Sequence, residues 1–305
     1  MSRAGAGAGP GAGARAEAGP GTVARAGAGA GPALVVALNG ARGAADGTAV
    51  PMSPADLVDA ARAAVAAGGR ELLVHARTPC GRESLSPRVV GPLLEALRDA
   101  GLGGGATVRG GSGPGGAVAA ERAGAAPAAG RVALGVAVSV ESEPDRAGRL
   151  ARVRSWTVLP DRAVVRFAEP GARELAEALL ERGVAVDAEV PVGGDPGPSA
   201  RFLAWPLRDP ARVRLVAELA SADPGPVAEL LRRLPPVPVL LFGRGMAAWP
   251  ALRLAARYGT GARIGVGDVL HLPDGRAARS NAELVTAAAG VLAAGAATVT
   301  TAGSR

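Results

Sequence analysis

Eight short aliphatic runs, separated by segments with helical periodicity, constrain the fold of this chain more than any other feature. The runs are nearly continuous in Val, Leu and Ala, as expected for parallel strands that are buried on both faces. Eight strands that alternate with helices are the repeat of a (β/α)8 TIM barrel, so the strand count favours this fold over the alternative, a doubly wound open sheet. The runs lie at residues 33–38, 71–75, 132–138, 163–167, 184–190, 213–219, 237–242 and 262–266.

Capping signals mark several of the helices between the runs. Ser53 followed by Pro54 predicts the start of the first helix. Residues 171–182 predict another helix, which ends at Gly183. Asn281 is predicted to cap the last helix. The segment after the fifth run has the weakest helical pattern, so its helix is the least well defined of the set.

Two segments have a composition unlike the rest of the chain. Residues 1–32 consist of Gly, Ala and Pro with occasional Arg, too few large apolar side chains to offset the entropy cost of ordering, and are predicted to be disordered. Residues 101–130 have the same character and are predicted to be an insertion that lengthens one loop. A single barrel domain is therefore expected over residues 33–300.

The charge pattern argues against a nucleic-acid partner. The net charge is +7, and all 34 basic residues are arginine, but they are scattered among acidic residues. Aromatic residues make up only 2% of the chain, so stacking platforms for bases are missing as well. A single cysteine fits a reducing compartment. No membrane helix or signal peptide is recognisable, and a cytoplasmic protein without a membrane partner is expected.

Polar residues are predicted to gather at the mouth of the barrel, where the carboxyl ends of the strands meet. His75 ends the second run and Asp268 follows the eighth. Arg77 and Arg263 are able to hold a carboxylate with two hydrogen bonds each. Cys80 has no histidine beside it in the sequence and is a weak candidate nucleophile. The residues alone predict a site for an anionic ligand, with a structural histidine and salt-bridged arginines as the alternative.

Four longer motifs follow one another along the chain: VHARTPCGRESL at Val74–Leu85, WTVLPDRAVVRFAEPGA at Trp156–Ala172, GVAVDAEV at Gly183–Val190 and ARIGVGDVLHLPDGRAARSNAELV at Ala262–Val285. In this order they resemble the β-keto acid cleavage enzymes, the family named after 3-keto-5-aminohexanoate cleavage. The resemblance implies a TIM barrel and a Claisen-type reaction. In that reaction zinc polarises a β-keto acid, and an acetyl group passes between the keto acid and acetyl-CoA to give acetoacetate and a CoA ester. It also implies a homo-oligomer.

The resemblance assigns roles at the predicted mouth. It makes Asp268 the base that removes a proton and Arg263 the group that stabilises developing negative charge. His75 matches one of the zinc ligands of the family. The residues expected to contact the substrate, a β-keto acid or another small carboxylate, are Arg77, Ser139 and Asp187.

The chain departs from the family pattern at the metal site. The family holds zinc with a His-x-His pair and a glutamate, but the first histidine position is Leu73 and the glutamate position is Gly267. A zinc site needs three protein ligands, and neither leucine nor glycine supplies one. The mouth has instead gained Arg42 and Arg244, which favours direct binding of an anion.

Three functions are consistent with these residues. The first is the zinc-dependent family enzyme with a rebuilt metal site. The second is a metal-free pseudoenzyme, or an anionic-metabolite-binding barrel, without turnover. The third is a metal-independent lyase that uses Asp268 and Arg263.

Overall fold

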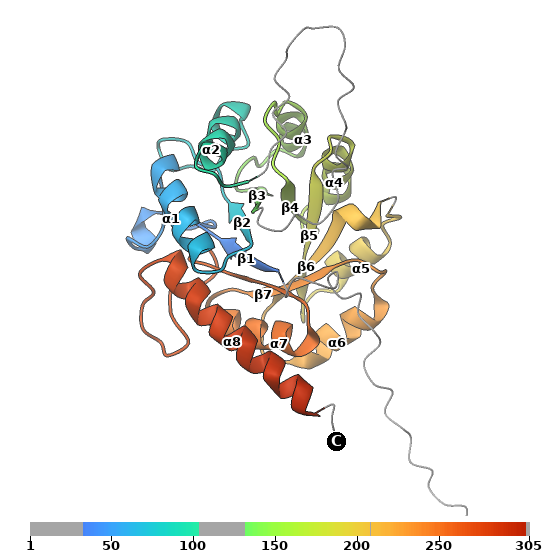
Figure 1. Cartoon of the computed structure of the whole chain (residues 1–305). Helices are drawn as coiled ribbons and strands as arrows, with labels where there is room; N and C mark the ends of the chain where they lie inside the picture. The colour runs from blue at the N-terminus through green and yellow to red at the C-terminus, as the bar shows by residue number, and fades with distance from the viewer. Residues whose placement is uncertain (1–32, 104–131, 208, 303–305) are drawn as a thin grey trace, which may run out of the picture.

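The computed structural model describes residues 33–103, 132–207 and 209–302, which form a closed barrel of parallel strands inside a ring of helices (Figure 1). Neighbouring strands follow the order of the chain, and β8 pairs with β1. The predicted (β/α)8 barrel is therefore confirmed, and the doubly wound open sheet is excluded because the sheet closes on itself. Residues 1–32 and nearly all of the predicted insertion at 101–130 lie outside the described residues.

All eight predicted runs coincide with strands, and their boundaries agree to within two residues. Continuous burial explains the agreement, because every residue of a short barrel strand faces either the interior or the helices. The strands are β1 (Leu34–Ala37), β2 (Glu71–Val74), β3 (Ala133–Val138), β4 (Arg162–Arg166), β5 (Ala185–Val192), β6 (Val213–Leu219), β7 (Val239–Gly243) and β8 (Gly261–Ile264).

A helix follows every strand, as the alternating pattern predicts. Ser53 caps α1, and its hydroxyl accepts a hydrogen bond from the backbone of Asp56. The helix after the fifth strand is a short one of seven residues. The helices are α1 (Pro54–Ala66), α2 (Pro87–Asp99), α3 (Arg146–Arg154), α4 (Ala172–Glu181), α5 (Gly197–Leu203), α6 (Pro224–Arg233), α7 (Ala248–Tyr258) and α8 (Asn281–Ala302).

Asn281 has a different role from the predicted helix cap. It lies in the first turn of α8, where the hydroxyl of Ser280 accepts the capping bond from the Glu283 backbone, 3.2 Å. The Asn281 amide instead accepts a hydrogen bond from the Val266 backbone and donates one to the Leu38 carbonyl, both 2.9 Å. This buried side chain therefore joins the ends of β1 and β8 below the mouth.

The hydrophobic core has two parts. The larger part packs the outward faces of the strands against the helices, with residues such as Val36, Leu94 and Leu179 fully buried. A smaller cluster fills the barrel interior and includes Leu73, Val164 and Phe242. Leu73, where the family resemblance implies a zinc-binding histidine, is thus a packing residue that is 3% exposed.

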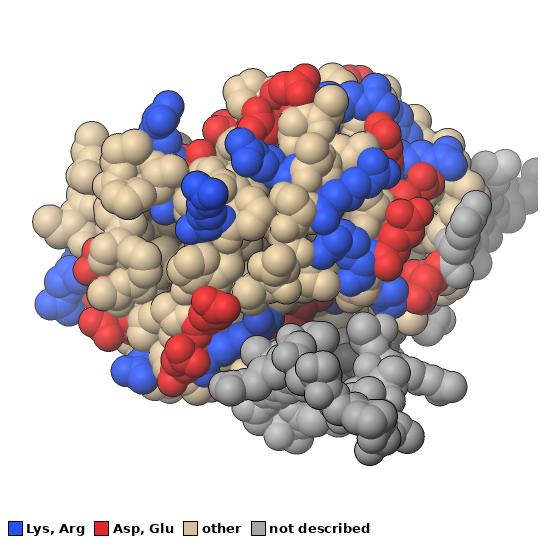
Figure 2. All heavy atoms as spheres, turned by 90° about the horizontal axis from the view of Figure 1, so that it is seen from above, with Lys and Arg blue, Asp and Glu red and all other residues tan. Residues whose placement is uncertain are grey.

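The outer surface mixes charges of both signs. Figure 2 shows arginine and acidic side chains interspersed on the face seen from above, with no broad area of one sign. Among the described helices, none combines the length and apolar character that a membrane crossing requires.

Candidate functional site

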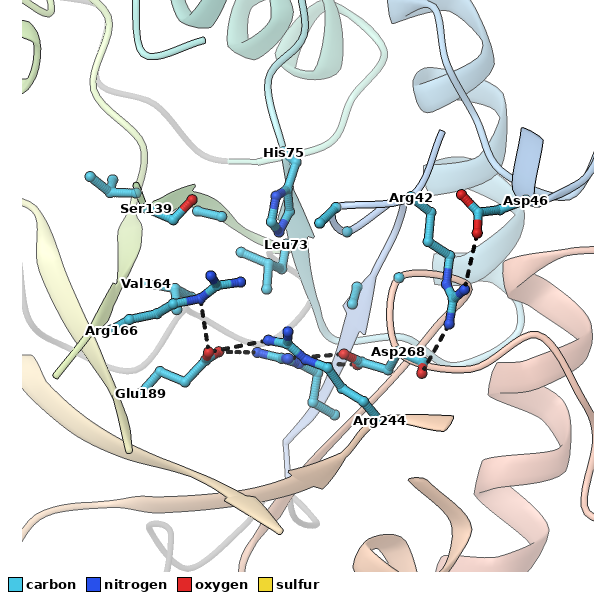
Figure 3. Close-up of a pocket in the computed structure, with 17 residues that line it drawn as sticks. Arg42, Asp46, Leu73, His75, Ser139, Val164, Arg166, Glu189, Arg244 and Asp268 are labelled. Carbon is cyan, nitrogen blue, oxygen red and sulfur yellow. Dashed lines mark hydrogen bonds and ion pairs between the residues drawn. The ribbon is translucent and has the colours of Figure 1, made fainter. Parts of the chain in front are cut away.

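A pocket of about 230 Å3 opens at the carboxyl ends of the strands (Figure 3). Its lining comes from the strands and loops of both halves of the barrel, at the end where (β/α)8 enzymes carry their reactive groups. Apolar side chains such as Leu73 and Val164 form part of the wall. Three carboxylates, His75 and Ser139 also line the pocket, together with four arginines, Arg42, Arg166, Arg244 and Arg263.

A buried ion-pair network built around Arg263 of β8 forms one wall. Its Nε and Nη2 donate to the two carboxylate oxygens of Asp268, at 3.0 and 2.9 Å, and its Nη1 donates to Glu189, at 3.1 Å. The guanidinium also stacks 3.3 Å from the ring centre of Phe242. Burial opposes its charge, but Asp268 and Glu189 raise the pKa of Arg263 above the ordinary value. Arg263 is therefore a fixed cation whose hydrogen bonds serve the protein.

The predicted base Asp268 is part of this network. Its side chain is 2% exposed, and both of its oxygens accept hydrogen bonds from Arg263. Neither oxygen could turn to a substrate without giving up one hydrogen bond of this bidentate pair. The structure brings Asp268 and Arg263 together as predicted, but in contact with each other.

β5 presents two carboxylates to the barrel interior, two residues apart. The carboxylate of Asp187 lies deeper in the barrel, outside the mouth pocket, where Arg162 and Arg214 bind it. The carboxylate of Glu189 lies nearer the mouth and lines the pocket. The position that the resemblance gave to Asp187 is thus occupied by Glu189. Side chains alternate along a strand, so Asp187 and Glu189 point to the same side and Glu189 lies nearer the mouth.

Arg77 holds two loops together. Its Nη1 donates to the Gly81 carbonyl, at 2.7 Å, and its Nη2 donates to the Gly40 carbonyl, at 2.8 Å. The same Nη2 lies 3.6 Å from Glu83. The predicted carboxylate-binding residue is therefore placed behind the pocket lining, where it fixes the loops that follow β1 and β2.

His75 is held rigidly just after β2. The Asn39 side chain pairs with the backbone N–H and carbonyl of His75, each at 2.9 Å. Its Nδ1 lies 3.0 Å from Glu83 Oε2. Burial favours a higher pKa for Glu83, but His75, Ser142 and Arg77 outweigh it and lower the pKa. Sequence reasoning missed Glu83, eight residues beyond His75 in the same loop, because no periodic pattern links the two positions.

The arginines at the rim differ in how fully they are paired. Arg166 donates to both oxygens of Glu141, at 2.8 and 2.9 Å. Arg244 contacts Glu218 and Glu189, each at 3.2 Å. Both guanidinium groups thus have carboxylates of the protein as counter-ions, which weakens their attraction for an external anion.

Arg42 is the least engaged arginine of the pocket. It lies 3.5 Å from Asp46 and 3.5 Å from the Asp268 carbonyl, and both contacts are long for hydrogen bonds. Its Nε is buried and has no hydrogen-bond partner among the described residues. Figure 3 shows this side chain reaching into the pocket region from the side opposite Arg166. Arg42 is therefore the cation with most capacity for a ligand.

The residues present do not fit the zinc site that the family resemblance implies. Within the described ranges, no group of three His, Cys, Asp or Glu residues is placed to hold a metal. A Cβ atom on Gly267 would lie 2.7 Å from the Gly40 nitrogen and 2.9 Å from its Cα. The loops after β1 and β8 therefore occupy the space in which a side chain at position 267 would begin. His75 is left without the two companion ligands that zinc requires.

The fold and the pocket place this protein in the class of (β/α)8 barrel proteins with a polar site at the carboxyl ends of the strands. The sequence profile of the β-keto acid cleavage enzymes matches residues 33–304, so the chain belongs to that family.

Similar proteins of known structure share the architecture. A type I 3-dehydroquinate dehydratase from Clostridium difficile is 11% identical, with a TM-score of 0.51, over 88% of this chain and 93% of that chain. ObcA, in a ternary complex with a C4-CoA adduct and oxalate, is 14% identical, with a TM-score of 0.55, over 83% and 67%. At these identities the similarity shows the fold alone. No curated protein sequence matches the chain.

Proposed function

We propose that this member of the family binds a small carboxylic acid of the β-keto acid type at the barrel mouth without using zinc. Family membership supports the chemical type of the ligand. The pocket of about 230 Å3 supports a compound of a few carbon atoms, since sites for larger organic ligands begin at roughly 300 Å3. The observation that carries the proposal is the buried, unpartnered Nε of Arg42 beside this pocket.

Arg42 is the residue that we assign to the ligand carboxylate. A guanidinium group binds a carboxylate through two parallel hydrogen bonds, and the present contacts of Arg42 are long enough to be exchanged for such a pair. Arg263 acts differently, because Asp268 and Glu189 already occupy its donors. It provides a fixed positive wall that balances the buried carboxylates.

The zinc-dependent exchange with acetyl-CoA receives no support from the donor set. The Lewis acid of that reaction needs ligands where this chain has Leu73 and Gly267. The metal-independent lyase is not favoured either, because Asp268 is bound on both oxygens by Arg263. A binding protein without the family turnover is the function that the geometry supports best.

The test combines metal analysis with binding. Protein purified with zinc supplied is analysed by elemental mass spectrometry, and acetoacetate binding is measured by calorimetry. We expect zinc at background and measurable binding, which R42Q weakens by roughly tenfold or more because a charge-assisted pair is lost. R173Q is the matched control, since Arg173 forms an exposed pair with Glu177 on α4.

Two results would overturn the proposal. One is about one zinc per chain together with zinc-dependent formation of a CoA ester from acetyl-CoA, which would restore the family reaction. The other is the absence of acetoacetate binding, or binding that R42Q and R173Q change equally.

A further inference from the structure

The hydrogen bond between His75 and Glu83 fixes the orientation of an imidazole ring in the pocket wall. Nδ1 lies 3.0 Å from Glu83 Oε2, and the backbone of His75 is clamped by Asn39. The His75 and Glu83 side chains are 9% and 5% exposed. A ring held at one nitrogen by a buried carboxylate has little freedom to turn, so the other nitrogen points in a defined direction.

The surroundings of Glu83 determine which ring nitrogen carries the proton. Ser142 donates a hydrogen bond to Glu83 Oε2 at 3.1 Å, and Arg77 lies 3.6 Å from Oε1. These contacts hold the Glu83 carboxylate in place beside the ring. A carboxylate only accepts hydrogen bonds, which places the imidazole proton on Nδ1. In this tautomer Nε2 carries a lone pair and acts as an acceptor.

This acceptor belongs to the pocket. His75 is a lining residue, and Figure 3 shows its ring directed into the space between Ser139 and Arg42. Nε2 makes no hydrogen bond with the described residues. The carboxylates of the lining are already engaged by arginines of the protein: Asp268 and Glu189 accept hydrogen bonds from Arg263. Asp46 lies 3.5 Å from Arg42, which still keeps one donor without a partner among the described residues. A ligand seated here therefore finds an unpartnered donor at Arg42 and an unpartnered acceptor at His75.

A hydroxyl group matches this arrangement better than the other donors that a small ligand offers. An ammonium group could donate to Nε2, but it has no lone pair with which to accept a hydrogen bond from an arginine. A keto oxygen would place its lone pairs against the lone pair of Nε2, leaving both without a hydrogen bond. A hydroxyl donates to Nε2 and still accepts from an arginine.

We propose that the preferred ligand is a β-hydroxy acid, whose carboxylate pairs with Arg42 and whose hydroxyl donates to Nε2 of His75. The inference rests on the proposed function, because it assumes that a small carboxylic acid occupies this pocket. It further specifies that the β-carbon of the ligand carries a hydroxyl group and not a keto group, a distinction that family membership does not decide. His75 is thereby a specificity-determining residue, and Glu83 is the positioning residue behind it.

The test compares 3-hydroxybutyrate with acetoacetate, two acids with the same carbon skeleton that differ at the β-carbon. Calorimetric titration of the full chain, using each enantiomer of the hydroxy acid, gives the ratio of the two dissociation constants. We expect the better enantiomer to bind roughly tenfold more tightly than acetoacetate, because a site with a fixed acceptor rejects a ligand that lacks the donor.

Two variants separate this preference from structural damage. E83Q keeps the size of the side chain but lets an amide donate to Nδ1, which moves the ring proton to Nε2 and is expected to remove or reverse the preference. H75F removes the acceptor and is expected to bring the ratio close to one. S221A, a change on an exposed serine after β6, should leave the ratio unchanged. For each variant, the dissociation constant of acetoacetate is divided by that of 3-hydroxybutyrate. A variant that binds both acids equally more weakly leaves this ratio unchanged, so general damage to the pocket is not mistaken for a loss of preference.

The outcomes distinguish the two proposals. If acetoacetate binds as tightly as 3-hydroxybutyrate or more tightly, the hydroxyl preference is wrong, while carboxylate binding through Arg42 stands. If 3-hydroxybutyrate is preferred but E83Q and H75F keep the preference, the assignment to His75 is wrong. If neither acid binds, both the proposed function and this inference are wrong.

Discussion

Arg42, Arg244 and Arg263 line the same pocket but differ in what they offer a ligand. Arg263 donates to Asp268 and Glu189 and is almost fully buried. Arg244 is shared between two glutamates, whereas Arg42 keeps a buried nitrogen without a partner. The number of arginines in the sequence predicts a positive mouth, but their pairing decides which of them attracts an anion. Such pairing involves residues far apart in sequence, and only the structure reveals it.

Cys80 provides a prediction about a single side chain. Its thiol is exposed, and a hydrogen bond from Thr78, with further help from Arg82, lowers its pKa to about 7. Because the thiolate is the nucleophile, the rate of alkylation by iodoacetamide should rise with a midpoint near pH 7. The chain has one cysteine, so labelling followed by mass spectrometry reports this site alone. T78V should move the midpoint to higher pH, and a midpoint that does not move would contradict the assigned cause.

At the scale of structural elements, the loops after β1 and β8 meet through two glycines. Gly40 has a φ of +56°, and a Cβ at either glycine would lie within 3 Å of the other backbone. Gly267 also donates to the Ala37 carbonyl at 3.0 Å, which holds the loop in place. The contact closes the barrel mouth between its first and last strands. It also explains in steric terms why the glutamate of the family has no room here.

Substitution of Gly267 tests whether this contact is rigid. G267A should lower the free energy of unfolding by about 1–3 kcal/mol, because the added methyl group meets backbone atoms that must move. The measurement is urea denaturation. G194A is the control, since a Cβ at Gly194 meets no atom within 4 Å. Equal stability of the two variants would show that the loops part easily.

The same measurement bears on the metal site that the family resemblance implies. If G267A is well tolerated, the double change of Leu73→His with Gly267→Glu becomes a fair attempt to restore zinc binding. If G267A is destabilising as expected, the double change should leave zinc at background, because the second ligand cannot be placed without opening the mouth.

The strands and most helices were predictable because each depends on local pattern. The signals used were short aliphatic runs for the strands, Ser53 with Pro54 for a helix start and Gly183 for a helix end. Each signal spans only a few residues, so it can be recognised without knowing which distant element packs against it. Asn281 failed as a predicted cap because its partners, at Leu38 and Val266, come from two other elements. The pocket was predictable only in outline. Strand ends identified His75, Ser139, Arg263 and Asp268, whereas Glu83 emerges only from its three-dimensional contact with His75.

For the molecule as a whole, a second ionic layer crosses the barrel below the mouth. Asp187 binds Arg162 and Arg214, and Arg214 also pairs with Glu71 of β2, at 2.8 Å. Four strands are joined through this layer, which lies deeper in the barrel than the pocket at the mouth. Burial raises the pKa of Asp187, but the two arginines overcome it and lower the pKa to about 2. The carboxylate therefore stays charged at every pH at which the protein is expected to work.

Removal of this charge tests its contribution to global stability. D187N should lower the free energy of unfolding at neutral pH by about 3–5 kcal/mol, because the buried arginines lose their partner. E229Q, which removes an exposed pair on α6, should change it by less than about 0.5 kcal/mol.

The pH dependence has a definite sign. The Asp187 contribution is present above the ordinary pKa of 3.8 and is lost as the pH falls towards about 2. Wild-type protein should therefore lose more stability than D187N over that interval in acid denaturation. Parallel acid profiles for the two proteins would contradict this assignment.

The pairing of β8 with β1 also affects how the protein is made. The ribosome produces β1 first and β8 last, so an incomplete sheet with two open edges persists until the end of synthesis. Arg263 and Asp268 emerge with that last strand, long after His75 and Arg42. The pocket is therefore incomplete while the chain is being translated, and the proposed ligand could stabilise only finished molecules. Until then the two open edges are exposed to other chains, and this is the stage at which a chaperone would have most to protect.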